Sequence, residues 1–164
     1  TYQIRASSPY GYDERQYGSP GFNLPIGRLT RTPHGEYPQY HTSSDDVDFI
    51  EAVSLADSLS VYRQVIDLLE TNGPYVNKQP KCEPQLGRRG LYAAIGGQTD
   101  IERRQQAMLW VLNLSDGQHT LLDIANRAGM PYDVIRETAA LLVERNLLEP
   151  GSGATSSAFT NPKL

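Results

Sequence analysis

The stretch TLLDIANRAGMPYDVIRETAALL, residues 120–142, decides the fold of the C-terminal half of this chain. Thr120 is a favourable N-cap residue, and the apolar residues that follow it predict a short helix. Gly129 and Pro131 then end this helix and begin another, in the order in which these two residue types are usually found. We expect the second helix at about 132–145. A short helix, a tight turn and a second helix predict a helix-turn-helix.

The residues on either side of this stretch complete a small domain, for which we expect the range 101–150. Residues 102–114 have a broad apolar face that includes Trp110, which predicts a helix, and 115–117 is a turn. Residues 147–149 could start a wing strand. The sequence therefore predicts a winged helix-turn-helix domain.

The charge of this domain argues against binding to DNA. Between residues 103 and 150 there are five arginines and six acidic residues, so the domain carries a net charge of −1. The expected recognition helix begins with the acidic Asp133, and such a surface gains little from counterion release. We therefore expect no nucleic acid as a partner. We expect contact with protein instead, including homo-oligomer formation through the winged helix.

Upstream of this domain the sequence predicts a longer helix. Four carboxylates between positions 45 and 51 precede its first turn, where the helix dipole favours negative charge. The run Asn-Gly-Pro at 72–74 is a strong stop signal. We assign the helix to a first domain at 1–74. Its apolar residues recur at spacings of four and three, which puts them on one helical stripe: Leu55, Leu59, Tyr62, Ile66 and Leu69.

The remaining segments are rich in residues that break helices and strands. Residues 1 to about 45 contain many Gly, Pro and Tyr, with one apolar piece at 22–29 that could be a short or edge strand beside a larger sheet. Six glycines and prolines make 75–100 a linker, whose apolar patch at 91–95 could dock on a neighbour. The polar end at 151–164 is expected to be a flexible tail.

The composition of the whole chain excludes several classes of protein. No apolar run approaches the ~20 residues that a membrane-spanning helix needs, so we expect no membrane partner. The single cysteine, Cys82, excludes a disulfide framework and a cysteine-based structural zinc site within the chain. The net charge of −4 argues against a protein that is held to nucleic acid mainly through phosphate contacts. No targeting signal is present, and we expect a cytoplasmic protein. Since the first residue is Thr1, we also expect a fragment or a processed chain.

The densest group of chemically active residues surrounds His41. A neutral imidazole followed by the hydroxyl of Thr42 and the carboxylate of Asp45 can be a metal ligand with a neighbouring group that orients the ring. A histidine before an acidic helix start can also be a capping or hydrogen-bonding residue. We expect the other two histidines, His34 in a turn and His119 before a helix cap, to be solvated. A catalytic zinc needs about three protein ligands, so the other ligands of such a site would lie upstream.

Three blocks of sequence in this region resemble the closing segment of the catalytic domain in the co-catalytic zinc aminopeptidases. In order, they are GYDERQY at 11–17, PGFNLP at 20–25 and YHTSSD at 40–45. More closely, RTPHGEYP at 31–38 and KCEPQLG at 81–87 resemble a bacterial family of aminopeptidase-like proteins that ends in a winged helix.

The resemblance implies a fold class and a set of site residues. The fold class is α/β: the C-terminal fragment of a parallel-sheet zinc-peptidase-like domain, followed by an all-α winged helix-turn-helix module. His41 matches the last zinc ligand of the family, whose complete site holds two zinc ions. Asp45 would lie beside this ligand, and Asp13 matches an aspartate of the family that could act on the substrate. No catalytic residue falls within the chain, because the metal-bridging carboxylate and the general-base glutamate would lie upstream.

The function expected from this resemblance is hydrolysis of an amide or peptide bond by metal-activated water. The substrate would be a peptide or an aminoacyl compound, and the cofactor would be zinc. We expect the isolated chain to bind zinc weakly and to lack peptidase activity. One alternative is a regulatory winged-helix protein that binds DNA or protein without catalysis. Another is an assembly protein that keeps the aminopeptidase shape without its metals.

Overall fold

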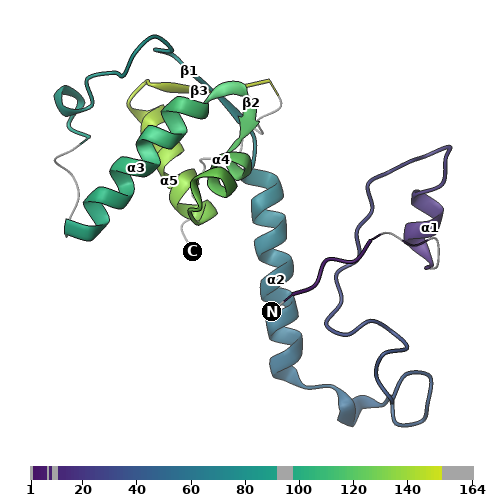
Figure 1. Ribbon diagram of the computed structural model, residues 1–164. Coiled ribbons are helices and arrows are strands. Elements are labelled where there is room, and N and C mark those ends of the chain that lie inside the picture. Colours follow the sequence, from purple (N-terminus) through teal and green to yellow (C-terminus); the bar gives the residue numbers. More distant parts are fainter. Residues whose placement is uncertain (1, 7, 9–10, 92–97, 153–164) are drawn as a thin grey trace. The chain divides into compact units, whose positions relative to one another are not determined.

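The computed structural model describes residues 2–6, 8, 11–91 and 98–152 (Figure 1). The chain divides into two compact units, Thr1–Leu59 and Ser60–Leu164. The boundary falls within a long helix. All buried residues among those described lie in the second unit, from Gly73 onward.

The second unit contains the winged helix-turn-helix that the sequence predicts (Figure 1). Its elements are β1 (Pro74–Asn77), α3 (Gln98–Leu114), β2 (Asp116–Thr120), α4 (Leu121–Ala128), α5 (Tyr132–Glu144) and β3 (Leu148–Pro150), with a short 3-10 helix, η2 (Gly87–Arg89), between β1 and α3. The strands form an antiparallel sheet in the order β2-β1-β3, so β1 lies in the middle. Helices α4 and α5 form the helix-turn-helix, and α3 packs against both.

Helix α4 begins and ends at the two capping residues that the sequence indicates. Thr120 Oγ1 accepts a hydrogen bond from the Asp123 N–H (3.2 Å), and the Asp123 carboxylate accepts one from the Thr120 N–H (2.9 Å). This reciprocal pair is a capping box. Gly129 ends α4 in the left-handed region at φ 63°, where only glycine avoids a steric cost. Pro131 directly precedes α5, so the turn between the helices is short and fixed.

The core of the second unit joins its three helices to the central strand. Apolar residues from each helix are removed from solvent, as the sequence pattern predicts for the three helical segments. The largest fully buried side chains include Tyr75, Met108, Leu121, Ile124, Ile135, Leu142 and Leu147.

The segment 75–100, expected as a linker, differs from that expectation. The residues of β1 pair with both β2 and β3, and Tyr75 lies in the core. Leu86 and Leu91 are also buried there. The physical reason is that the two outer strands need a central partner for their backbone N–H and C=O groups, and β1 supplies it. Residues 92–95 of the expected docking patch lie outside the described residues, as does most of the expected tail at 151–164.

The first unit contains α1 (Asp13–Tyr17), the 3-10 helix η1 (Val47–Phe49) and the beginning of α2 (Ala52–Thr71). Helix α2 confirms the long helix predicted upstream of residue 72. The expected piece of a parallel sheet is not seen: described residues 2–59 contain no strand, and the expected edge strand at 22–29 is irregular. A strand needs a partner for its backbone groups, and no described segment pairs with this one. Among the described helices, not one combines the length and the apolar character of a membrane span.

Candidate functional site

His41 lies in an exposed turn of the first unit, and its backbone conformation is unusual. Its φ of 59° is in the left-handed region, which residues other than glycine adopt infrequently. The hydroxyl of Thr42 holds the turn, because it donates to the Gln39 carbonyl (2.8 Å) and accepts from the Ser44 N–H (3.2 Å). Thr42 is therefore used within the turn and does not orient the imidazole.

Aromatic stacking holds the imidazole of His41. Its ring lies on the ring of Tyr40, with centroids 4.0 Å apart and planes 15° from parallel. Tyr40 also contacts His34 (5.6 Å) and the edge of Tyr37 (5.7 Å), and Tyr37 stacks on Phe49 (6.0 Å). No described residue forms a hydrogen bond with a ring nitrogen of His41. Within the part of the chain that the structure describes, neither nitrogen of this ring is occupied by a hydrogen bond.

His34 lies in a turn, as the sequence suggests, and its ring also belongs to the same aromatic cluster. Its ring is half-buried and contacts Tyr12 as well as Tyr40. Arg28 lies 3.3 Å from His34 Nδ1 and forms an ion pair with Glu14 (3.1 Å). Since a guanidinium can only donate, His34 Nδ1 is the acceptor in this contact. The pKa of Glu14 is below its ordinary value, chiefly because its own backbone N–H bonds to the carboxylate, with Arg28 adding to the effect.

The carboxylates near His41 have local structural roles. Asp46 caps η1, because its Oδ1 accepts a hydrogen bond from the Asp48 N–H (3.0 Å). The acidic run therefore does begin a helix, although it is a 3-10 helix ahead of α2. Asp45 is exposed in the turn after His41, and Asp13 is the exposed first residue of α1.

The side chains around His41 do not supply the full set of ligands that zinc requires. Among these residues no three His, Cys, Asp or Glu side chains are arranged to hold a metal ion. His41 offers one imidazole, whereas zinc needs about three protein ligands. His41 alone can supply at most one ligand of a zinc site, and the roles of His41, Asp45 and Asp13 stay predictions.

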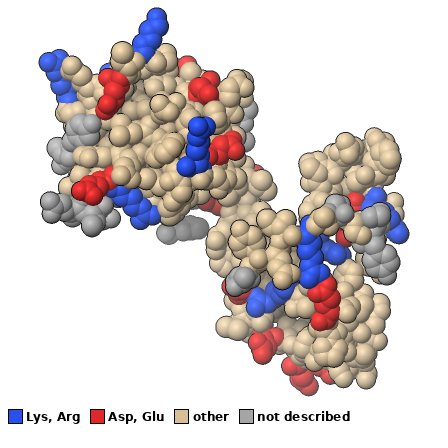
Figure 2. All heavy atoms as spheres, in the orientation of Figure 1, with Lys and Arg blue, Asp and Glu red and all other residues tan. Residues whose placement is uncertain are grey.

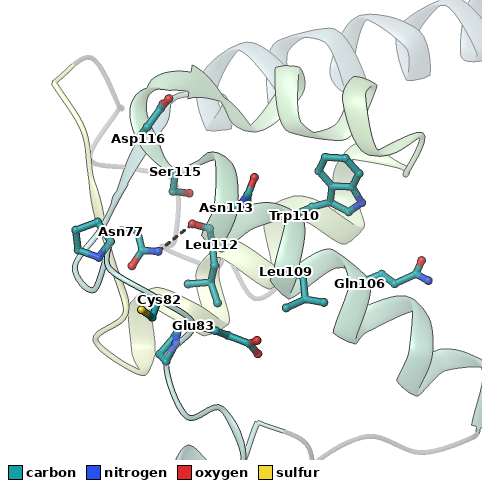
Figure 3. Close-up of a pocket in the computed structure, with 12 residues that line it drawn as sticks. Asn77, Cys82, Glu83, Gln106, Leu109, Trp110, Leu112, Asn113, Ser115 and Asp116 are labelled. Atoms are coloured by element: carbon teal, nitrogen blue, oxygen red, sulfur yellow. Dashed lines mark hydrogen bonds between the residues drawn. The ribbon is translucent and has the colours of Figure 1, made fainter.

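A second candidate site is a groove of about 730 Å³ in the second unit, between α3 and the segment that follows β1 (Figure 3). The exposed Leu109 and the partly exposed Trp110 give it an apolar surface. Its wall includes Ser115, a buried hydroxyl without a hydrogen-bond partner among the described residues. The charged residues that line it are Glu83 and Asp116, and none of the lining residues is a lysine or an arginine. Sequence reasoning identified Trp110 only as part of an apolar helix face.

The carboxylate of Asp116, at the edge of this groove, forms hydrogen bonds with nearby residues. Asp116 Oδ1 accepts hydrogen bonds from the N–H groups of Gln118 (2.8 Å) and His119 (3.1 Å), and it lies 3.1 Å from His119 Nδ1. These bonds, that of Gln118 foremost, lower the pKa of Asp116 to about 2. His119 is thus paired as well as partly exposed. Because the groove keeps an ionised carboxylate and has no cation, it is unsuited to a phosphate or another anion.

The first turn of α5, the expected recognition helix, is in contact with α2. The hydroxyl oxygens of Tyr132 and Thr71 lie 3.0 Å apart, and Arg136 Nη1 lies 3.7 Å from the Asp67 carboxylate. Lys and Arg side chains are interspersed with Asp and Glu on the face shown in Figure 2. The end of α5 that a helix-turn-helix would insert into DNA therefore contacts the protein's own helix.

Comparison with known proteins gives two family matches. Residues 73–150 match a family of winged helix-turn-helix domains, and residues 1–72 match a family described as a domain of unknown function. The boundary between the two matches falls at the end of α2.

Two relatives from Clostridium acetobutylicum are longer than this chain. One is provisionally named a polysaccharide biosynthesis protein with aminopeptidase-like domain; it is 47% identical over 148 residues, which are 90% of this chain and 34% of that protein. The other is a crystal structure of a provisionally named peptidase, with 43% identity and a TM-score of 0.76 over 88% of this chain and 31% of that one. The chain thus spans about a third of the length of these relatives.

Proposed function

We propose that this chain is the C-terminal part of a zinc-dependent aminopeptidase-like hydrolase, in which His41 is a zinc ligand. The observation that carries the proposal is the state of His41: an exposed imidazole, stacked on Tyr40, with no hydrogen bond from a described residue to its nitrogens. A capping histidine, the alternative, would use one nitrogen for a neighbouring backbone group. The names given to the two relatives, one with an aminopeptidase-like domain and one a peptidase, support the proposal.

In this proposal the chain positions a ligand, and other parts of the protein supply the acid–base groups. When bound, a pair of zinc ions would polarise the scissile carbonyl of a peptide or aminoacyl substrate and lower the pKa of a bridging water. Stacking on Tyr40 fixes the plane of the His41 ring before any metal binds, which reduces the entropy lost on coordination. Asp45 would lie beside this ligand, and Asp13 would contact the substrate.

The test is the zinc content of the intact protein that contains this chain. His41→Ala should lower zinc affinity more than tenfold and abolish most of the turnover of aminoacyl substrates, as measured by native mass spectrometry and a hydrolysis assay. His34→Ala is the matched control, because it removes an imidazole from the same aromatic cluster without removing the proposed ligand. A His41→Ala protein with undiminished zinc and turnover would contradict the proposal.

For the winged helix, we propose a role in protein contact, including contact with a second copy of the chain. The observation that favours this role over DNA binding is the engagement of α5 by α2 through Arg136 and Tyr132. The net charge of −1 between residues 103 and 150 supports the same conclusion.

A further inference from the structure

Helix α2 has two sides of opposite character. On the polar side, Asp67 and Thr71 contact Arg136 (3.7 Å) and Tyr132 (3.0 Å) of α5. No residue of α2 is buried. On the apolar side, the large aliphatic side chains are exposed to solvent: Leu59 by 54%, Ile66 by 57%, Leu55 by 60% and Leu69 by 67%.

The apolar side is wide. With about 100° between successive residues, ten consecutive positions around the helix cover about half of its circumference and include no charged residue. They are eight apolar residues and two serines: Ser54, Leu55, Ser58, Leu59, Val61, Tyr62, Val65, Ile66, Leu68 and Leu69. All the charged residues of α2 lie on the other half: Asp57, Arg63, Asp67 and Glu70.

The width of this side indicates the shape of what covers it. Its spacing of four and three would also suit a pair of helices, but such a pair buries a narrow seam flanked by charged residues that bond across it. On one flank of the stripe in α2 the residues are Val61 and Val65 instead. A helix with a wide apolar side covers a flat layer, and the face of a β-sheet is such a layer.

We propose that the apolar side of α2 packs on the face of a β-sheet in the aminopeptidase-like part of the same protein. This inference rests on the proposed function, since it requires that part to exist. Two observations favour this occupant over a second copy of the chain. The chain spans 34% of a relative that has an aminopeptidase-like domain, so most of such a protein is available to cover α2. None of the described residues 2–72 is buried, so this region has no hydrophobic core of its own. Its apolar side chains need a further layer of the protein to pack against.

The consequence is that α2 joins two parts of the protein. Its polar side holds α5 through Asp67 and Thr71, and its apolar side would be fixed to the hydrolase. The winged helix would then be attached to the hydrolase through packed side chains in addition to the covalent chain.

The experiment compares the intact protein with this chain by cysteine labelling. Cys82 is an exposed free cysteine, so Cys82→Ser provides the background. Ile66→Cys places a small, apolar reporter on the apolar side, and Gln64→Cys places the matched control on the charged side. With a maleimide reagent and mass spectrometry, residue 66 should label at least about tenfold more slowly in the intact protein than in this chain. Residue 64 should label at the same rate in both.

The other outcomes overturn the proposal. Equal labelling of residue 66 in both proteins would show that the apolar side is left open. Protection within this chain alone that increases with its concentration would identify a second copy as the occupant. If Ile66→Cys fails to fold in the intact protein, hydrogen exchange of α2 in the unmodified protein gives the same comparison. Labelling is measured on metal-free protein, so loss of zinc binding and loss of protection are separate results. A native gene product of only 18.2 kDa would overturn both proposals.

Discussion

Ile135 in α5 and Ile66 in α2 both belong to helices with an apolar periodicity in the sequence, yet their environments are opposite. Ile135 is 0% exposed, whereas Ile66 is 57% exposed. The periodicity predicts the helix and its apolar side in both cases. Whether that side is buried depends on which other segments can reach it, and the period of the helix carries no information about those segments.

The partners of α5 are close to it in the sequence. The capping box at Thr120 and the left-handed Gly129 bring α4 against α5 through a short turn, so local signals are sufficient to predict the contact. The apolar side of α2 has no such neighbour among the described residues. An apolar helix side that no neighbouring segment can cover therefore predicts that a distant segment, or another chain, covers it.

The largest difference in stability is expected when each of these two isoleucines is replaced by alanine and the two variants are compared. Ile135→Ala should lower the free energy of unfolding of this chain by about 2–5 kcal/mol, because it leaves a cavity in the core. Ile66→Ala should change it by less than about 0.5 kcal/mol, because an exposed side chain is lost and alanine is the better helix former. Urea denaturation of both variants measures the difference. A loss of similar size for Ile66→Ala would show that α2 is packed within this chain.

Most of the second unit could be predicted from the sequence. Thr120, Gly129 and Pro131 act through contacts within a few residues of each. As the sequence indicates, Thr120 begins α4, Gly129 ends it and Pro131 precedes α5. The position of β1 could not be predicted, because a four-residue strand is defined by its two partners, which follow it by dozens of residues. Tyr75 therefore resembled a linker residue in the sequence, although it is buried in the core.

The candidate site could be predicted only in part. His41 and its acidic neighbours are recognisable in one block of sequence. Its stack on Tyr40 is a contact between adjacent residues, whereas the contact of Tyr40 with His34 joins two turns. The ion pair between Arg28 and Glu14 joins segments that no short-range rule connects. A set of metal ligands from several strands is defined by tertiary structure in the same way, so one histidine predicts a ligand without predicting the site.

An intermediate effect tests Tyr75, the core residue that the pattern missed. Burial, with Tyr132 adding to it, raises the pKa of Tyr75 to about 12. The folded protein therefore holds this phenolic proton more tightly than the unfolded chain, whose tyrosines titrate near pH 10. The corresponding stability is complete below about pH 10 and should fall by about 2 kcal/mol as the pH rises to about 12. Urea denaturation between these pH values measures the loss.

The control for this titration is Tyr75→Phe, which keeps the ring and removes the ionisable group. Burial also raises the pKa of Tyr132, although its bond with Thr71 opposes the rise. Since Tyr132 is present in both proteins, the difference between their pH profiles isolates Tyr75. Identical profiles would mean that Tyr75 is not buried, and that 75–100 behaves as the linker that the sequence suggested.

The smallest expected effect lies where the two helices meet, at the ion pair of Asp67 with Arg136. Both side chains are partly exposed, by 59% and 32%, and pairs of this kind contribute about 0–1 kcal/mol. Arg136 Nε is also buried without a partner among the described residues, so its removal eliminates an unsatisfied donor. A double-mutant cycle of Asp67→Ala and Arg136→Ala should give a coupling energy below about 1 kcal/mol in urea denaturation.

The same Arg136→Ala variant distinguishes the two roles of the winged helix. If α5 reads DNA, gel-shift binding should survive ~200 mM salt and weaken when this arginine is lost. We expect no such binding for either protein, because the first turn of α5 is held by Asp67 and Thr71 and its surroundings carry no excess of positive charge.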